Sequence, residues 1–348
     1  MRRIPSFFGV AATVIFALAA VGAGSASAAS QPPAPLTMSD WQAEIGQASA
    51  MGSGCFHASF PALVWQAATC VTAPELPFVP APSSSPNGAP DTVGNGVDYS
   101  AVVQGLISEA TGTFTDVSSK ISERGQLGGS GPRLANQYSL QLNTEFFPGS
   151  PACAGASNPG KCLAWQQFVY TTSSNVVFMQ YWLIDYDTTC PGGWFSDSGD
   201  CYANSSASTL TGKALTAKSL ATLSLSGSAT SGGDDQVEVI TGSGEATLAT
   251  GPDTELDLAP HWNTTEWGVY GDGGGGEAYF GKSDTLEAAT TLTATSSSAP
   301  ACIAEGFTGE TNNLRLATTP ALGGESSPTM ASKQTNGSAG TASCAVAA

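Results

Sequence analysis

The feature that most restricts the fold is a long succession of short apolar runs, each closed by turn-forming residues. From Val97 onward these runs are rich in Val, Thr, Tyr, Phe and Trp, and clusters of Gly, Ser, Asn and Asp separate them. No long segment keeps an apolar period near 3.6 residues, so strands are expected rather than long helices. We therefore predict an all-β domain, a two-sheet antiparallel β-sandwich. The expected strands span residues 110–117, 138–146, 165–171, 176–186, 221–227, 236–241, 245–250, 266–270, 278–280 and 288–294.

The start of the chain has the pattern of an export signal. Arg2 and Arg3 precede an apolar segment that runs from Phe7 to about Gly22, and small residues follow up to Ala28. This order is typical of a secretory signal peptide, so we predict cleavage after residue 28 and a secreted, extracellular product. An uncleaved membrane anchor is the alternative. It needs about 20 uninterrupted apolar residues, and glycines at 22 and 24 interrupt this run early.

The charge balance excludes one class of partner. Without Arg2 and Arg3 the chain keeps nine basic residues against 28 acidic ones, a formal charge of 9 − 28 = −19. Such a chain cannot replace the counterions of nucleic acid or of an anionic membrane, so neither is an expected partner. The same balance suits an acidic medium, where protonation of carboxylates reduces their mutual repulsion. Solubility alone is the simpler explanation of the charge.

The cysteine count points to an oxidising compartment. Eight cysteines fall into neighbouring couples along the chain, and short loops between neighbours favour disulfides within each couple. A zinc site is the alternative, but the sequence has no CxxC motif and only two histidines, His57 and His261, far apart. No metal and no cofactor is therefore expected. The predicted pairs are Cys55 with Cys70, Cys153 with Cys162, Cys190 with Cys201, and Cys302 with Cys344.

Changes in composition divide the exported chain into four parts. Residues 29–72 are predicted to form a small disulfide-closed module or a pro-segment, with a short helix around residues 39–44 capped by Ser39. Residues 73–95 are dense in proline, which prevents regular helices and strand ladders, so this stretch is predicted to be a linker. Residues 96–302 are the expected sandwich. Residues 303–348 are rich in Ser, Thr, Gly and Ala, and we expect a loosely ordered tail tethered by a disulfide.

Familiar nucleophilic and metal chemistries fit the sequence poorly. A Ser-His-Asp triad would have to use His57 or His261, and no GxSxG motif is present. A cysteine protease needs a free thiol, whereas all eight cysteines are expected to be paired. Calcium binding by the loop carboxylates Asp234, Asp235 and Asp272 is conceivable, but such Asp-Gly clusters are usually plain turns, and their spacing matches no EF-hand.

Aromatic and amide side chains concentrate on a few of the expected strands. They occur in WQQF (165–168), in FMQYWLIDY (178–186) and in the pair Glu266-Trp267. Side chains alternate between the two faces of a strand, so one face can present Gln and Glu among aromatic rings while the other builds the core. The simpler interpretation is that these are core aromatics with solvated amides.

In their order along the chain, these segments resemble the eqolisins, the secreted glutamic peptidases. The similar segments are YSAVVQGLISEATGTFTDV (99–117), SLQLNT (139–144), AWQQFVY (164–170), QYWLIDY (180–186) and TTEWGVYGD (264–272). The resemblance spans roughly residues 99–294, and the order of the segments contributes more to it than any single motif. It implies a concanavalin-like jelly roll that hydrolyses peptide bonds at acidic pH with one glutamate and one glutamine.

The resemblance also implies particular site residues. Glu266 takes the place of the catalytic glutamate, and the catalytic glutamine falls on Gln166 or Gln167. Because neighbours on a strand point to opposite faces, only one of the two glutamines can serve. The carboxylate can deprotonate a water and return the proton to the leaving amine, while the neutral amide stabilises the oxyanion. The aromatic residues expected to bind a polypeptide substrate are Trp165, Tyr181, Trp182 and Trp267.

Several positions depart from the family pattern. The family has Thr-Gly after its glutamine, where this chain has Gln167-Phe168 or Phe168-Val169; Tyr181 stands where a glutamate is expected. These changes favour two alternatives: a non-catalytic sandwich that binds a glycan or a peptide through an aromatic groove, and a cell-surface structural protein. Four glycines at 273–276 follow Asp272, and we expect either a flap over a cleft near Glu266 or a surface turn.

Overall fold

The structure is a computed structural model that describes residues 35–48, 52–81, 98–324, 327–337 and 344. The described residues from Leu36 onward belong to one compact unit. The predicted signal peptide, residues 1–28, lies outside the described residues. No helix in the described part of the chain is long and apolar enough to span a bilayer.

The fold is an antiparallel β-sandwich, as predicted, and its larger sheets each have ten strands. Their main paths are antiparallel throughout. Along the first, here called sheet 1, the order is β2 (Gln66–Ala68), β1 (Cys55–Ser59), β16 (Glu245–Pro252), β15 (Asp234–Ile240), β14 (Ser224–Ser228), β5 (Ile107–Thr115), β19 (Thr285–Ala294), β24 (Thr329–Thr335) and β22 (Arg315–Leu316), with β23 (Ala321–Gly323) also paired to β24.

The second large sheet, sheet 2, carries the strands of most functional interest. Its order is β11 (Phe195–Asp197), β12 (Asp200–Asn204), β10 (Val176–Ile184), β9 (Leu163–Thr171), β8 (Ser139–Thr144), β17 (Thr264–Tyr270), β4 (Ser100–Val102) and β20 (Ala301–Ile303), with β13 (Ser206–Thr209) joining β10 to β3 (Val71–Thr72). A small third sheet contains β21 (Thr311–Asn312), β18 (Glu277–Phe280), β6 (Glu123–Gly125) and β7 (Leu134–Ala135). The short helices are α1 (Met38–Ile45), η1 (Pro151–Gly155), η2 (Ala217–Thr222) and η3 (Asp253–Glu255).

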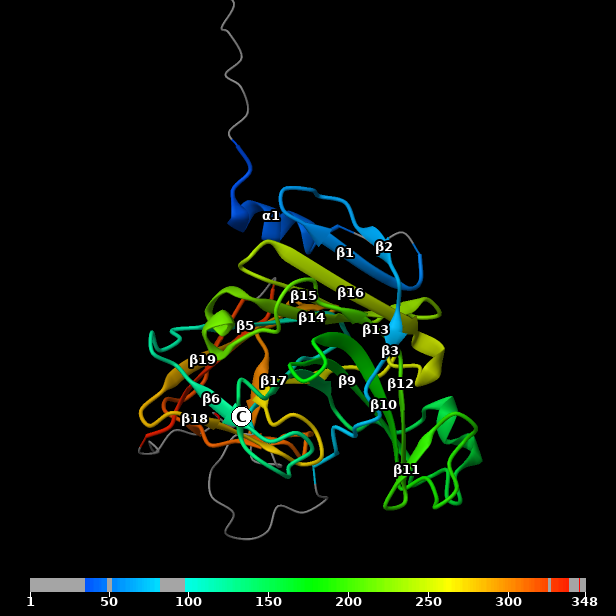
Figure 1. Ribbon diagram of the computed structural model, residues 1–348. Coiled ribbons are helices and arrows are strands. Elements are labelled where there is room, and N and C mark those ends of the chain that lie inside the picture. The colour runs from blue at the N-terminus through cyan, green and yellow to red at the C-terminus, as the bar shows by residue number, and fades with distance from the viewer. Residues whose placement is uncertain (1–34, 49–51, 82–97, 325–326, 338–343, 345–348) are drawn as a thin grey trace, which may run out of the picture. The chain divides into compact units, whose positions relative to one another are not determined.

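Aromatic rings of sheet 2 press directly onto glycines of sheet 1. A Cβ atom at Gly112 of β5 would lie 2.1 Å from the Trp267 ring, and one at Gly227 of β14 would lie 2.4 Å from the Phe168 ring. The indole Nε1 of Trp267 also donates a hydrogen bond to the carbonyl of Thr113 (3.0 Å). Figure 1 shows β14, β15 and β16 in one layer and β9, β10 and β17 in the next. The main core therefore lies between these two sheets.

Described residues of the segment 29–72, predicted to be a small disulfide-closed module or a pro-segment, pair with strands of the sandwich. Strand β1 pairs with β16 from Cys55↔Ala249 to Ser59↔Glu245, and β3 pairs with β13. Helix α1 lies beside β1 and β16 (Figure 1) and buries Trp41 and Ile45 there. The helix is capped by Thr37, whose hydroxyl accepts from the amide of Asp40 (3.2 Å), and not by Ser39 as expected.

The described residues after position 302 also belong to the sheets. Strand β20 pairs with β4, and β24 pairs along seven residues with β19, which differs from the expected loose tail. The physical reason is alternation: in TMASKQT, Met330, Ser332 and Gln334 are buried while the residues between them are partly exposed, so a Ser/Thr-rich run still forms a strand. Of the predicted linker, residues 73–81 are described; residues 82–95 lie outside the described part.

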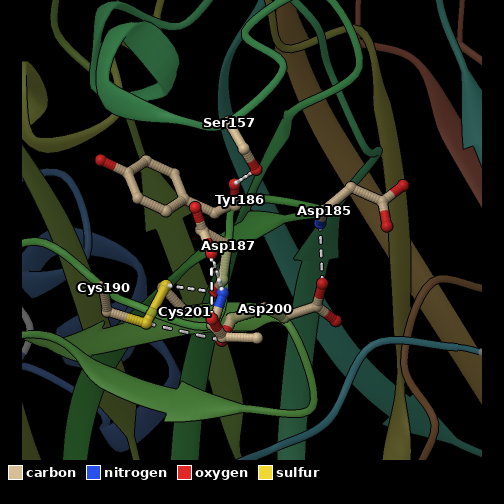
Figure 2. The surroundings of a disulfide bond; sticks show 8 residues. Ser157, Asp185, Tyr186, Asp187, Cys190, Asp200 and Cys201 are labelled. Atoms are coloured by element: carbon tan, nitrogen blue, oxygen red, sulfur yellow. Dashed lines mark hydrogen bonds between the residues drawn. A yellow bond between two sulfur atoms is a disulfide. The ribbon is translucent and has the colours of Figure 1, made fainter.

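All four predicted disulfides are confirmed: Cys55–Cys70, Cys153–Cys162, Cys190–Cys201 and Cys302–Cys344. Figure 2 shows Cys190–Cys201, which ties β12 to the loop that follows β10. In the same region the amide of Asp185 donates to the carboxylate of Asp200 (2.7 Å). The crosslink and this hydrogen bond hold the end of β10 against the start of β12.

Candidate active site

Five polar side chains form a row across five adjacent strands of sheet 2. Glu266 on β17 is paired in register with Asn143 on β8, and Asn143 is paired with Gln167 on β9. Gln167 is paired with Gln180 on β10, which in turn is paired with Asn204 on β12. Directly opposed residues of antiparallel strands project to the same face of the sheet. We call these five residues the polar row.

The polar row lies on the outer face of sheet 2. The neighbouring residue Gln166 points the other way, because its Nε2 donates to Asp235 on β15 of sheet 1 (2.8 Å). Trp267, next to Glu266, likewise reaches into sheet 1. Side chains alternate along a strand, so Gln167 and Glu266 must face away from sheet 1. The structure therefore brings Glu266 and Gln167 to one face and places Gln166 on the opposite one.

Glu266 is completely buried, and backbone and side-chain donors surround one of its carboxylate oxygens. Oε2 accepts hydrogen bonds from Asn143 Nδ2 (2.8 Å), from the amide of Phe307 (3.0 Å) and from the amide of Thr308 (3.1 Å). Burial raises the pKa of Glu266 well above its ordinary value, and these donors only partly oppose the shift. Burial therefore disfavours the ionised form of this carboxyl group.

A second carboxyl group, Asp98, lies beside Glu266. After burial, the charge of Asp98 is the next cause of the raised Glu266 pKa, and a hydrogen bond between the two carboxyl groups acts in the same direction. Asp98 also accepts from the amide of Tyr99 (2.8 Å) and from the hydroxyl of Tyr270. Two neighbouring buried carboxyl groups ionise together only at high cost, so a charge on Asp98 disfavours ionisation of Glu266. Sequence reasoning did not find Asp98, which stands alone before an expected strand without a motif.

The Gln167 amide has a defined orientation. Its Oε1 accepts from the indole Nε1 of Trp182 (3.2 Å), and its Nε2 donates to Gln141 Oε1 (3.1 Å). Gln141 also accepts from Asn143 Nδ2 (3.3 Å), the group that donates to Glu266. A chain of amides thus connects Gln167 to Glu266 across strand β8. Because an indole N–H can only donate, Trp182 fixes the oxygen side of the amide and directs the NH₂ side toward Gln141.

Two of the four predicted substrate-binding aromatics lie on the same face as the polar row. Trp165 and Trp182 are opposed in register, two residues from Gln167 and Gln180, with ring centroids 6.2 Å apart. Tyr181 and Trp267 lie instead in the core between the sheets. All four are buried, and Trp165 and Trp182 form a cluster with Tyr202 and Phe307. An open aromatic groove is therefore not present at these residues.

Glu310 is a further acid of the site that sequence reasoning missed. Its Oε1 accepts from the amides of Val79 (3.0 Å) and Gly275 (2.9 Å), and its Oε2 accepts from Thr308 Oγ1 (2.6 Å) and Gln141 Nε2 (3.4 Å). Burial raises the pKa of Glu310 to about 7, although these donors oppose the shift. It lies in the stretch expected to be a loose tail, so no periodic pattern marked it.

Two backbone segments cover the polar row. The first is the segment Pro74–Ala81, here called the strap; the second is Gly306–Glu310, here called the cover. They join through hydrogen bonds from the Ala81 amide to Phe307 O (2.7 Å) and from the Gly309 amide to Val79 O (2.7 Å). The glycine run expected near Glu266 contacts the strap: the Gly274 amide donates to Pro77 O (2.7 Å). Positive φ angles at Gly273, Gly274 and Gly275 give this loop its tight path.

The residues considered for metal or histidine chemistry are not assembled into a site. Asp235 lies between the sheets with Gln166, whereas Asp272 accepts from Thr171 Oγ1 (2.5 Å) and from the amide of Ser173 (3.2 Å). His261 stacks on Phe147, with centroids 5.0 Å apart. Within the part of the chain that the structure describes, no three His, Cys, Asp or Glu residues group in a way that could hold a metal ion.

Comparison with known proteins gives only a weak likeness. No protein-family model matches the chain, and no curated protein matches it. One similar solved structure is SCP-B, a member of the eqolisin family of peptidases in complex with the tripeptide Ala-Ile-His, at 9% identity and a TM-score of 0.24, covering 67% of this chain and 96% of that one. Another is scytalido-glutamic peptidase with a transition state analog inhibitor, at 10% identity and a TM-score of 0.23, covering 67% and 95%. Membership of the eqolisin family stays a prediction.

Proposed function

We propose that this chain is a secreted endopeptidase that works in acid, with Glu266 as general acid and base and Gln167 as oxyanion donor. The observation that supports this proposal is the register Glu266–Asn143–Gln167, which sets a carboxyl group and an oriented amide on one face of one sheet. The substrate is a polypeptide. The chemistry needs no cofactor, and the net negative charge of the chain disfavours nucleic acid as a partner.

In the proposed reaction, Glu266 and Asp98 form a carboxyl pair that holds one proton. The ionised member removes a proton from a water whose oxygen attacks the scissile carbonyl carbon, and the carbonyl oxygen becomes the oxyanion. Gln167 Nε2 donates to that oxygen, and the amide stays neutral in strong acid, when a histidine would be charged. The carboxyl group then returns its proton to the amine nitrogen as the C–N bond breaks. The raised pKa of Glu266, due to burial and Asp98, keeps a proton available for this last step.

Access to the pair requires the cover to move. Glu266 has no exposed surface, and the amides of Phe307 and Thr308 occupy its Oε2. A peptide carbonyl can reach Glu266 only where these backbone groups are displaced. The closed arrangement therefore corresponds to a resting state in this proposal.

The test is hydrolysis of acid-denatured casein at pH 3 to 4 by the secreted protein and by Glu266→Gln. General acid–base catalysis contributes about 10²–10⁴-fold, so the variant should lose at least about 100-fold in rate. Glu238→Gln is the matched control, because it also removes a buried carboxyl group whose pKa is raised, but on sheet 1. Its rate should equal that of the wild type. Equal rates in wild type and Glu266→Gln, or no hydrolysis in either, would reject the proposal.

The complete burial of Glu266 and of Trp165 and Trp182 favours a second candidate, a non-catalytic secreted sandwich. In that case the polar row only binds the two covering segments, and any partner, a glycan or a peptide, binds elsewhere. This candidate predicts that Glu266→Gln changes stability but has no activity to abolish. A glycan array with the wild-type protein distinguishes a carbohydrate-binding protein from a structural one.

A further inference from the structure

We infer that the outer face of sheet 2 is a groove for an extended polypeptide that carries an aromatic side chain, and that the strap Pro74–Ala81 is its built-in occupant. This inference rests on the proposed function in one respect, the position of the peptidase reaction beside the groove. The groove is defined by side chains that hydrogen-bond to a peptide backbone, by an apolar pocket and by an exposed backbone edge of the cover when the strap is absent. Peptide binding, without any measurement of hydrolysis, can therefore test it.

Side chains of the polar row form hydrogen bonds with the backbone of the strap. Gln180 Oε1 accepts from the amide of Phe78 (2.6 Å), and Gln180 Nε2 donates to the carbonyl of Leu76 (3.1 Å). Asn204 Nδ2 donates to the carbonyl of Pro74 (3.0 Å). Each of these hydrogen bonds goes to a peptide group, which every polypeptide has. The polar row thus provides recognition that does not depend on the sequence of the bound segment.

An apolar pocket beside the row receives one side chain of the strap. Phe78 is completely buried and packs among Val169, Val176, Phe178 and Ala207, with its ring centroid 6.0 Å from that of Phe178. Val169 is two residues from Gln167, and Phe178 is two residues from Gln180, so this pocket and the polar row share one face. The groove therefore selects a large ring at the position whose amide Gln180 holds.

The cover provides an edge on the other side of the strap. Pro80 and Thr308 form an antiparallel bridge, and hydrogen bonds flank it at Ala81–Phe307 and Gly309–Val79. Addition of an extended segment to a backbone edge is a common way for proteins to bind peptides. The amides of Phe307 and Thr308, on this same cover, hold Glu266. Release of the strap therefore frees the segment that closes the proposed catalytic carboxyl.

The strap is bound mainly by side chains, as a peptide ligand would be, and not by the continuous backbone ladder of a regular strand. Prolines at 74, 77 and 80 lack amide protons, so the strap cannot form a continuous ladder with a neighbouring strand. Being part of the chain, the strap competes at an effective concentration in the millimolar range, so a free peptide of similar affinity is largely excluded from the wild type.

The experiment measures binding of a fluorescent synthetic peptide, APELPFVPA, which has the sequence of residues 73–81. All proteins carry Glu266→Gln, so that the probe is not consumed. Adding Phe78→Ala empties the pocket and weakens the strap, and the probe should then bind at least tenfold more tightly than it binds Glu266→Gln alone. A further Gln180→Ala should lower this affinity about 30-fold, because it removes two hydrogen bonds to the probe's backbone, each worth about fivefold in affinity. A probe with alanine in place of its phenylalanine should not bind.

Phe147→Ala is the matched control, because it also removes a buried ring, one that stacks on His261 in the main core. It should leave probe binding at the level of Glu266→Gln alone. If Phe78→Ala does not fold, as judged by near-UV circular dichroism, Phe78→Leu takes its place with a smaller expected gain. Absence of probe binding in every folded strap variant, or an equal gain in Phe147→Ala, overturns the inference. Binding without any casein hydrolysis upholds the groove and rejects the peptidase.

Discussion

Glu266 and Gln167 lie on the same face of sheet 2, separated by the one strand on which Asn143 occupies the matching position. Adjacent strands lie about 4.8 Å apart, so the two backbones are about 10 Å from each other and their side chains approach from either side. Asn143 donates to Glu266. The side chains of Asn143 and Gln141 lie between the acid and the amide and connect them through hydrogen bonds.

The two adjacent glutamines should give opposite results on substitution. Gln167→Leu removes the proposed oxyanion donor and should lower casein hydrolysis about 10²–10³-fold. Its partner Trp182 Nε1 keeps a hydrogen bond to Gln180 Oε1 (3.1 Å), so the cost in stability should be small. Gln166→Leu should keep the activity but lower the unfolding free energy by about 1–3 kcal/mol, because it leaves Asp235 without this donor between the sheets. Urea unfolding measures the stability of each variant, and initial rates of casein hydrolysis measure its activity. Loss of activity in Gln166→Leu but not in Gln167→Leu would contradict the assignment of catalysis to the outer face of sheet 2.

Stability should decrease as pH rises from weakly acidic to weakly alkaline values. Burial raises the pKa of Glu123, Asp235 and Glu238 to about 8 and that of Glu145 to about 7. Below about pH 3.5 these groups are mostly protonated in both folded and unfolded chains. Between that pH and the raised values only the folded chain keeps the protons, so stability is lost progressively up to about pH 8. Urea midpoints measured from pH 4 to pH 8 should fall throughout; a maximum near pH 7 would contradict the shifts.

Glu238→Gln isolates one of these groups. The burial of Glu238, reinforced by the charge of Glu109, makes its ionisation unfavourable. The variant should therefore gain on the order of a few kcal/mol over the wild type at pH 8 and nothing near pH 4. Glu44→Gln, at an exposed position of α1, is the control and should leave the slope of stability against pH unchanged.

Asp98 should set the upper pH limit of activity. Its charge and its hydrogen bond both raise the pKa of Glu266, so Asp98→Asn should lower that pKa. The proton-donating form of Glu266 then disappears at a lower pH, and the alkaline limb of the kcat/KM profile should move in the same direction. An unchanged limb would show that the two carboxyl groups do not act as a pair during turnover.

Gly112→Ala should destabilise the sandwich because its Cβ would lie only 2.1 Å from the Trp267 ring. The sheets must separate locally to accept it, at a cost of about 2–3 kcal/mol. Gly192→Ala is the matched control, since a Cβ there meets nothing within 4 Å and its φ is not in the left-handed region. Thermal unfolding at pH 5 compares the two, and similar melting temperatures would contradict the close approach of the sheets.

Much of the fold could be predicted because β structure here follows local patterns. Every predicted strand overlaps an observed one, and β9 and β10 differ from their predicted ends by only two residues. The disulfide pairs followed from proximity along the chain. The domain boundaries were harder to predict from the sequence. Strands β1, β20 and β24 pair with strands distant in sequence, and a weak Ser/Thr pattern does not reveal where such partners lie.

The candidate site could be predicted in part. Glu266 and Gln167 came from a resemblance, and alternation implied that only one of two adjacent glutamines could serve, without choosing between them. Asn143 was missed because its position opposite Glu266 depends on strand register, which a single sequence does not determine. Asp98 and Glu310 lie outside the strands and reach the site through contacts with residues distant in sequence. The sequence also carried no clear signal that β9 and β10 are buried on both faces, because the residues that cover their outer face include the strap and the cover, which are distant in sequence.

The position of β1 and β24 near opposite edges of sheet 1 has a consequence for biogenesis. These strands come from almost the two extremes of the described chain, and the central strands between them also pair over long sequence separations, as β5 does with β19. Such nonlocal topology slows folding and postpones completion of the sheet until nearly all of the polypeptide has emerged. During that interval the unpaired backbone groups of the central strands would be free to associate with other chains. Substitutions in β24 should therefore have the largest effect on chaperone dependence and on the yield of folded protein.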